Sequence, residues 1–167
     1  TTMAALALEA RKRAHAPYSR FKVGAALKTR AGEIVTGCNI ENASYGLSMC
    51  AERVAVFKAV SEGLDDFDVV AVVADSKRIT PPCGPCRQIL WEFGGDLEVT
   101  LANLRGATGT HRMADLLPCT RTMVRPLDRL RTTAAIRPGG VPARRPHDTE
   151  CDAFAVRPLR IRGPWPA

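Results

Sequence analysis

Apolar residues recur at spacings of three and four in three segments of the chain, which is the pattern of one face of a helix. The first segment covers residues 3–14, with Thr1 and Thr2 as candidate caps, and the second covers residues 49–60. The third covers residues 86–93 and ends before a pair of glycines. The pattern therefore predicts three helices.

Four further segments have the composition of strands. Residues 21–29 and 34–39 flank a short turn that contains glycine, so together they predict a hairpin. Residues 69–74 form a nearly continuous apolar run, which suits a strand that is buried on both faces. Residues 98–103 form the fourth predicted strand.

The order of these elements is helix, strand, strand, helix, strand, helix, strand. A strand, helix, strand succession implies right-handed crossovers and a parallel portion of the sheet, with the hairpin on one side. We therefore expect an α/β fold in which a mixed sheet is sandwiched between helices. The periodicity fades after Leu117.

The chain has 167 residues and a net charge of +7, and nearly all of the excess lies at its C-terminal end. Residues 1–117 carry 14 basic and 13 acidic side chains, whereas residues 118–167 carry 10 arginines, 4 acidic side chains and 8 of the 12 prolines. We expect one folded domain over residues 1–118 and a poorly ordered tail over residues 119–167. A polyanion-binding arm is the alternative interpretation of the tail.

The cysteine content favours a reducing compartment. No apolar run approaches the roughly 20 residues of a membrane span, and no signal peptide is visible. We therefore expect a cytoplasmic protein without membrane contact, in which a Cys-x-x-Cys pair indicates metal or redox chemistry. The six cysteines are Cys38, Cys50, Cys83, Cys86, Cys119 and Cys151.

Two short motifs combine into a candidate metal site. Cys50 begins the second predicted helix, and Cys83 and Cys86 lie at the start of the third. Helix N-termini carry partial positive charge and stabilise thiolates, the form of cysteine that binds metals. Three protein ligands with an open fourth position are typical of a catalytic zinc site. We expect one Zn²⁺ per chain.

Glu52 is the candidate catalytic residue of this site. It follows Cys50 by two positions, so it lies near the metal without being a ligand. A carboxylate there can take a proton from water and return it to a substrate nitrogen. Arg53 is the candidate group that offsets the negative charge of three thiolates. A structural zinc knuckle with Cys38 as fourth ligand, or a redox pair, remains an alternative.

Several longer stretches resemble the small, zinc-dependent, homotetrameric cytidine deaminases. The resemblance covers residues 3–118, and the motifs that carry it are residues 16–27, 37–46, 50–53 and 82–88. It implies a three-layer α-β-α sandwich around a mixed five-stranded sheet. It also implies hydrolysis of cytidine and deoxycytidine to uridine and deoxyuridine with release of ammonia, a reaction of pyrimidine salvage.

The resemblance assigns roles to the candidate residues. Cys50, Cys83 and Cys86 would hold zinc, and Glu52 would move protons. Asn39 and Glu41 would bind the ribose hydroxyls, and Phe21 would pack on the base. The backbone of Ala51 would meet the polar edge of the base, and Tyr45 would help to build the site of a neighbouring subunit.

The chain departs from the family after Pro118. The family has a Phe three residues further on that covers the base in another subunit, and this chain has Arg121 there. The composition of the tail suggests either a shifted reading frame or an added arm. Two other functions stay open: deamination of another aminopyrimidine nucleoside, and deamination of single-stranded nucleic acid with the tail as a binding arm. The nearly neutral domain makes nucleic acid the less favoured partner.

Overall fold

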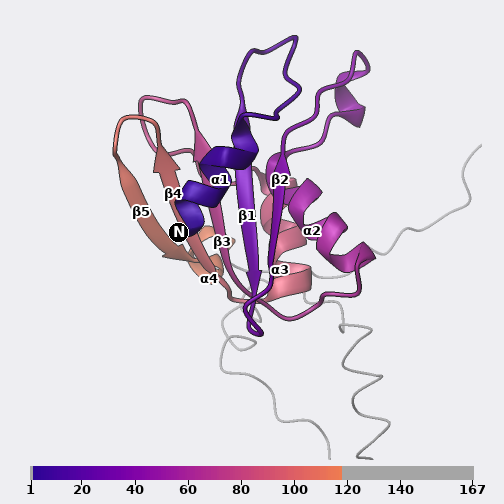
Figure 1. Cartoon of the computed structure of the whole chain (residues 1–167), viewed down its shortest axis with the longest axis vertical. Coiled ribbons are helices and arrows are strands. Elements are labelled where there is room, and N and C mark those ends of the chain that lie inside the picture. The colour runs from indigo at the N-terminus through magenta and orange to yellow at the C-terminus, as the bar shows by residue number, and fades with distance from the viewer. Residues whose placement is uncertain (1, 118–167) are drawn as a thin grey trace, which may run out of the picture. The chain divides into compact units, whose positions relative to one another are not determined.

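The computed structural model describes residues 2–117 (Figure 1). The described residues do not include the predicted tail or the domain boundary at its start. They therefore also leave out Cys119, Arg121 and Cys151.

Four helices and five strands make up the described fold. The helices are α1 (Met3–Arg11), α2 (Ala51–Ser61), α3 (Gly84–Gly94) and the short α4 (Met113–Leu116), with a 3₁₀ turn, η1, at Tyr45–Leu47. The strands are β1 (Val23–Thr29), β2 (Ile34–Cys38), β3 (Phe67–Ala74), β4 (Glu98–Asn103) and β5 (Thr108–Arg112).

The described strands form one mixed sheet in the order β2-β1-β3-β4-β5. Among them, β3 and β4 pair in parallel, with Val72 opposite Leu101, and the other neighbours are antiparallel. The parallel pair is joined through α3, as expected for a crossover connection. The mixed five-stranded sheet and the hairpin on one side of it are therefore confirmed.

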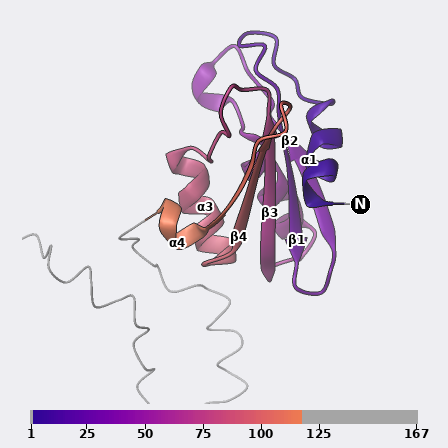
Figure 2. The ribbon, with the colours of Figure 1, turned by 90° about the vertical axis from the view of Figure 1, so that its left-hand side faces the viewer.

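Helices cover both faces of the sheet, which gives three layers (Figure 2). Helix α1 packs on one face against Ala26, Ala71 and Ala102. Helices α2 and α3 cover the other face, where the larger core contains Leu27 and Val70 among other buried side chains. Alternate residues of β1 thus enter different cores, as the pleat of a strand requires.

Most predicted boundaries agree with the structure to within two residues, but the first helix is shorter than expected. It begins as predicted, since the Thr2 hydroxyl caps it by accepting from the Ala5 N–H at 3.3 Å. It ends at Arg11, because the N–H groups of Arg13 and Ala14 reach back only three residues. Strand β5 has no counterpart in the apolar pattern, and only the family resemblance led us to expect five strands.

Two glycines let the helices approach the sheet closely. A Cβ at Gly24 would lie 2.0 Å from the Ala7 carbonyl oxygen of α1. A Cβ at Gly37 would lie 2.5 Å from the Ala51 carbonyl oxygen of α2. At position 37, therefore, no side chain would fit between β2 and the first turn of α2. No helix among residues 2–117 has the length and apolar content to cross a bilayer.

We expect Gly37→Ala to destabilise the domain by about 1–3 kcal/mol, because the added methyl group forces α2 away from β2. Urea unfolding measures the change. Gly46→Ala is the control, since a Cβ at Gly46 meets no atom within 4 Å. Equal stability of the two variants would contradict the packing argument.

Candidate active site

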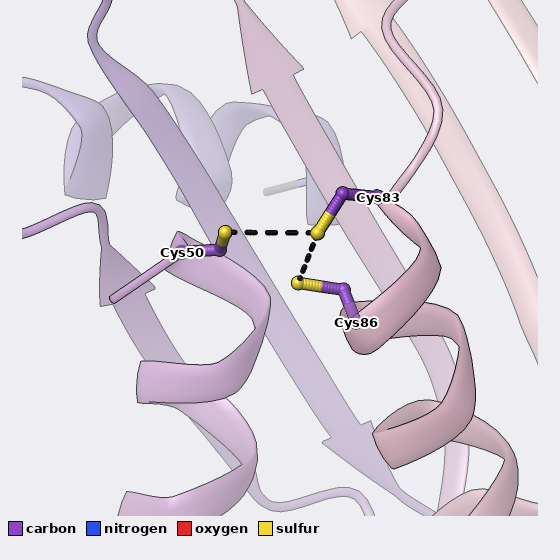
Figure 3. Close-up of side chains that lie close together, drawn as sticks. All are labelled: Cys50, Cys83 and Cys86. Atoms are coloured by element: carbon purple, nitrogen blue, oxygen red, sulfur yellow. Dashed lines mark hydrogen bonds between the residues drawn. The ribbon is translucent and has the colours of Figure 1, made fainter. Parts of the chain in front are cut away.

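Three cysteine sulfurs meet where α2 and α3 begin (Figure 3). Cys50 is the residue that precedes α2, Cys83 precedes α3, and Cys86 lies in the first turn of α3. The Sγ atoms of Cys50 and Cys83 are 3.8 Å apart, and those of Cys83 and Cys86 are 3.4 Å apart. All three sulfurs lie within 4.8 Å of one another, as the two motifs predicted.

Cys50 and Cys83 occupy the N-cap positions of α2 and α3. Residues at the caps of helices usually use their side chains to bind the free N–H groups of the first turn. Neither Cys50 nor Cys83 makes such a bond. The partial positive charge of both helix ends therefore remains available to stabilise thiolates.

The spacing of the sulfurs fits a zinc ion. With Zn–S bonds of about 2.3 Å, the corners of a tetrahedral site lie roughly 3.8 Å apart. Cys38 does not belong to the cluster, so the described residues offer three thiol ligands and no fourth. This argues against the structural zinc knuckle that the sequence left open.

Hydrogen bonds within the cluster shift the pKa values of the Cys50 and Cys86 thiols in opposite directions. A hydrogen bond from Cys86, and further ones from Arg53 and Cys83, lower the pKa of the Cys50 thiol to about 5. The bond to Cys50, together with burial, raises the pKa of the Cys86 thiol, because Cys86 is the donor. The other two thiols and the Arg53 side chain together stabilise a thiolate on Cys50.

Arg53 connects the cluster to the preceding loop. Its Nη2 atom donates to the Ser48 carbonyl oxygen at 3.1 Å and to the Cys50 sulfur at 3.6 Å. Its Nε atom is buried and has no hydrogen-bond partner within residues 2–117. The side chain therefore holds a positive charge beside the cysteines, where three thiolates would need it.

Glu52 is a buried carboxyl group next to the sulfurs. It is 5% exposed, and burial raises its pKa to about 7. The negative charge of Cys50 acts in the same direction, while a bond from its own backbone N–H opposes both. A carboxyl group with this pKa exists in both protonation states near neutral pH, as a residue that accepts and returns a proton requires.

A cavity of about 500 Å³ opens beside the cysteine cluster. Its lining comes from the start of β1 and the segment before it, the loop after β2, the start of α2, strand β3, and the loop before α3 with the first turn of that helix. Of the predicted site residues, those that line it are Phe21, Asn39, Glu41, Tyr45, Cys50, Ala51, Glu52, Arg53 and Cys83. The remaining one, Cys86, is buried behind them in the cluster.

Asn39 and Glu41 also hold the wall of this cavity in place. The Asn39 side chain accepts from the Val23 N–H and donates to the Phe21 carbonyl oxygen, each at 2.8 Å. Glu41 accepts from the backbone N–H groups of Tyr18 and Ser19 and from the Ser19 hydroxyl. The Ser19 hydroxyl contributes most to lowering the pKa of Glu41.

The two aromatic candidates differ in exposure. Phe21 is 36% exposed and Tyr45 is 76% exposed. Tyr45 lies on η1, which stands away from the sheet at one end of the domain (Figure 1). Phe21 is therefore a wall of the cavity, and Tyr45 offers its ring mostly to the outside.

The cavity includes residues that the sequence analysis did not single out. They are Ser19, Val23, Gly46, Ser48, Met49, Val72, Thr80, Pro81 and Pro85. Ser19 and Val23 lie within a stretch that matches the family, so the resemblance could have indicated them. Thr80 and Pro81 belong to a loop without a recognisable pattern, and no signal in the sequence marks them.

Comparisons with known proteins agree with this geometry. The family model described as "Cytidine and deoxycytidylate deaminase zinc-binding region" matches residues 1–102. A cytidine deaminase of Halalkalibacterium halodurans is 54% identical over 113 residues, which span 67% of this chain and 86% of the relative. A blasticidin-S deaminase of Bacillus cereus is 32% identical over 108 residues, which span 60% of this chain and 76% of the relative.

A solved structure supports the same assignment. The crystal structure of cytidine deaminase from Burkholderia pseudomallei is 47% identical and superimposes with a TM-score of 0.70, covering 71% of this chain and 96% of that chain. Its likeness extends over nearly the whole of that protein, and the three-layer fold is the same. With its zinc-binding motif region, its fold and its relatives in agreement, this chain belongs to the cytidine and deoxycytidylate deaminase family.

Proposed function

We propose that this protein is a zinc-dependent hydrolase that converts cytidine and deoxycytidine, with water, into uridine and deoxyuridine and ammonia. The observation that carries the proposal is the buried Glu52 carboxyl group, which lies with three clustered thiols at a cavity of about 500 Å³. The family and the named relatives support the substrate class.

Cys50, Cys83 and Cys86 hold the zinc ion in this proposal, one ion per chain. When bound, zinc supplies Lewis-acid chemistry: it lowers the pKa of water, so that a nucleophile exists near neutral pH. Glu52 takes one proton from the attacking water and passes it to N3 of the cytosine, while the water oxygen bonds to C4. Glu52 then takes the remaining proton from that oxygen, which becomes the C4 carbonyl oxygen, and delivers it to the amino group. The amino group leaves as ammonia when the C4–N bond breaks.

The other cavity residues orient the nucleoside. Phe21 packs against the base, and the backbone of Ala51 at the start of α2 meets its polar edge. Asn39 and Glu41 bind the ribose hydroxyls. Both side chains keep hydrogen-bonding capacity for this role, because an amide and a carboxylate offer more positions than the backbone contacts occupy.

The site is shared between subunits of a homotetramer in this proposal. The large exposed fraction of Tyr45 supports it, and so does that of Leu47, which is 70% exposed on the same turn. The four cysteines within the described residues form no disulfide, which supports a reducing compartment, and we place the protein in the cytoplasm.

Glu52→Gln is expected to lower turnover of cytidine by about 10²–10⁴-fold, because the amide cannot carry the proton. Loss of cytidine absorbance measures turnover, and zinc content and unfolding should stay as in the parent protein. Glu62→Gln, at the exposed C-terminal end of the same helix, is the matched control. Substantial activity in the Glu52→Gln variant would remove Glu52 from the mechanism.

Loss of one ligand should release the metal. We expect the purified protein to contain about one zinc per chain, and Cys83→Ser to lose zinc and activity together. Cys38→Ser, outside the cluster, should keep both. Zinc loss from the Cys38→Ser variant would instead indicate a closed, structural site. A protein that holds zinc but leaves cytidine unchanged would favour deamination of another aminopyrimidine nucleoside, and blasticidin-S, which the name of the relative from Bacillus cereus contains, would be tested next.

Sedimentation should show a particle of four chains of 18.1 kDa each. Because the site is shared, specific activity should fall when the protein is diluted enough for subunits to separate. A monomer whose specific activity does not depend on concentration would exclude the shared site.

A further inference from the structure

The loop between β3 and α3 is an unusual part of the cavity wall. It contributes Thr80 and Pro81 to the lining and leads directly into Cys83. Within residues 2–117, no backbone–backbone hydrogen bond outside the helices and strands involves residues 76–82. Hydrogen bonds from side chains therefore hold this loop in position.

Asn103, the last residue of β4, attaches the first part of this loop, while Arg87 donates to the Pro82 carbonyl oxygen at its end. Asn103 is only 7% exposed, and its Nδ2 atom donates to the carbonyl oxygens of Ser76 at 3.1 Å and Lys77 at 3.4 Å. Its Oδ1 atom accepts from the N–H groups of Arg105 and Ala107, both at 2.9 Å. An amide has two N–H groups and one oxygen with two lone pairs, so every hydrogen-bonding position of Asn103 is used.

A second link carries this attachment to the cavity. The Ser76 hydroxyl donates to the Arg78 carbonyl oxygen. Because that hydroxyl has one hydrogen, its 2.8 Å contact with the Thr80 hydroxyl must have Thr80 as the donor. Thr80 lines the cavity. A continuous path of hydrogen bonds thus runs from the β4–β5 turn through Asn103 and Ser76 to the cavity wall.

We propose that Asn103 is a positioning residue for substrate binding, which sets the place of the Thr80–Pro81 wall through Ser76. The proposal rests on the proposed function for its substrate and on the geometry for its mechanism. Asn103 is not among the residues that line the cavity. The oxygen and the nitrogen of its side-chain amide bind different segments. The oxygen accepts the hydrogen bonds that close the β4–β5 turn, and the nitrogen donates to the loop before α3.

Because the oxygen and the nitrogen of the Asn103 amide have different partners, one substitution can remove the contacts of the nitrogen alone. In Asn103→Asp, a carboxylate can still accept from Arg105 and Ala107, but it cannot donate to the two loop carbonyl groups. We expect the turn to remain and the loop to loosen. The Michaelis constant for cytidine should rise about tenfold while kcat changes less than about threefold, because the wall binds substrate and Glu52 is undisturbed.

A second readout does not depend on activity. Lys77 and Arg78 are exposed in the loop, and trypsin cuts after both residue types. We expect cleavage at these two positions, identified by mass spectrometry, to be about tenfold faster in Asn103→Asp than in the parent protein. Zinc content should not change. Should the parent protein fail to deaminate cytidine, the proposed function fails, and the cleavage rate still decides whether Asn103 holds the loop.

Two further variants separate positioning from general instability. Leu101→Ala creates a cavity in the core from the same strand and leaves the Asn103 amide intact, so it should lower stability without raising the Michaelis constant or the cleavage rate at Lys77 and Arg78. Ser76→Ala should raise the Michaelis constant, and its effect should not multiply with that of Asn103→Asp, because both act along one path. Parental values of both readouts in Asn103→Asp, or equal effects in Leu101→Ala, would overturn the proposal.

Discussion

The contact between β2 and the first turn of α2 determines where the chemistry of this domain is located. Gly37 leaves room for the Ala51 carbonyl oxygen at a distance that no side chain would allow. Ala51 stands between Cys50 and Glu52 in the sequence, so one close approach fixes a thiol and a carboxyl group together. The backbone of β2 thus positions the first turn of α2, and with it Cys50 and Glu52.

The electrostatic problem of the site is that sulfur and carboxylate charges share one small volume. Water would normally screen such charges, but Glu52 is almost completely buried. Two helix N-termini and the Arg53 guanidinium supply the opposing charge. Burial raises the pKa of Glu52 to about 7 in spite of this opposing charge, and the negative charge of Cys50 acts in the same direction as burial.

The sequence was sufficient for most of the fold and for the metal cluster, because helix starts and cysteines are local features. It was not sufficient for β5, whose Thr-Gly-Thr-His-Arg sequence has no apolar alternation and lies at the edge of the sheet. Nor did it indicate that Asn103 donates hydrogen bonds to the carbonyl oxygens of Lys77 and Ser76, which precede it by 26 and 27 positions in the chain. Such a contact depends on the parallel pairing of β3 with β4, which brings the loops after both strands to the same end of the sheet.

Arg87 gives the end of the described domain an unexpected connection. Its Nε atom donates to the Pro82 carbonyl oxygen at 2.7 Å, and its Nη1 atom donates to the Leu116 carbonyl oxygen at 2.8 Å. Pro82 precedes Cys83 of the thiol cluster, so one side chain joins the end of α4 to the loop that carries this cysteine. A sequence change that displaces Leu116 would therefore displace Arg87 and, through Pro82, the position of Cys83. The geometry of the proposed metal site can thus change without replacement of any of its three cysteines.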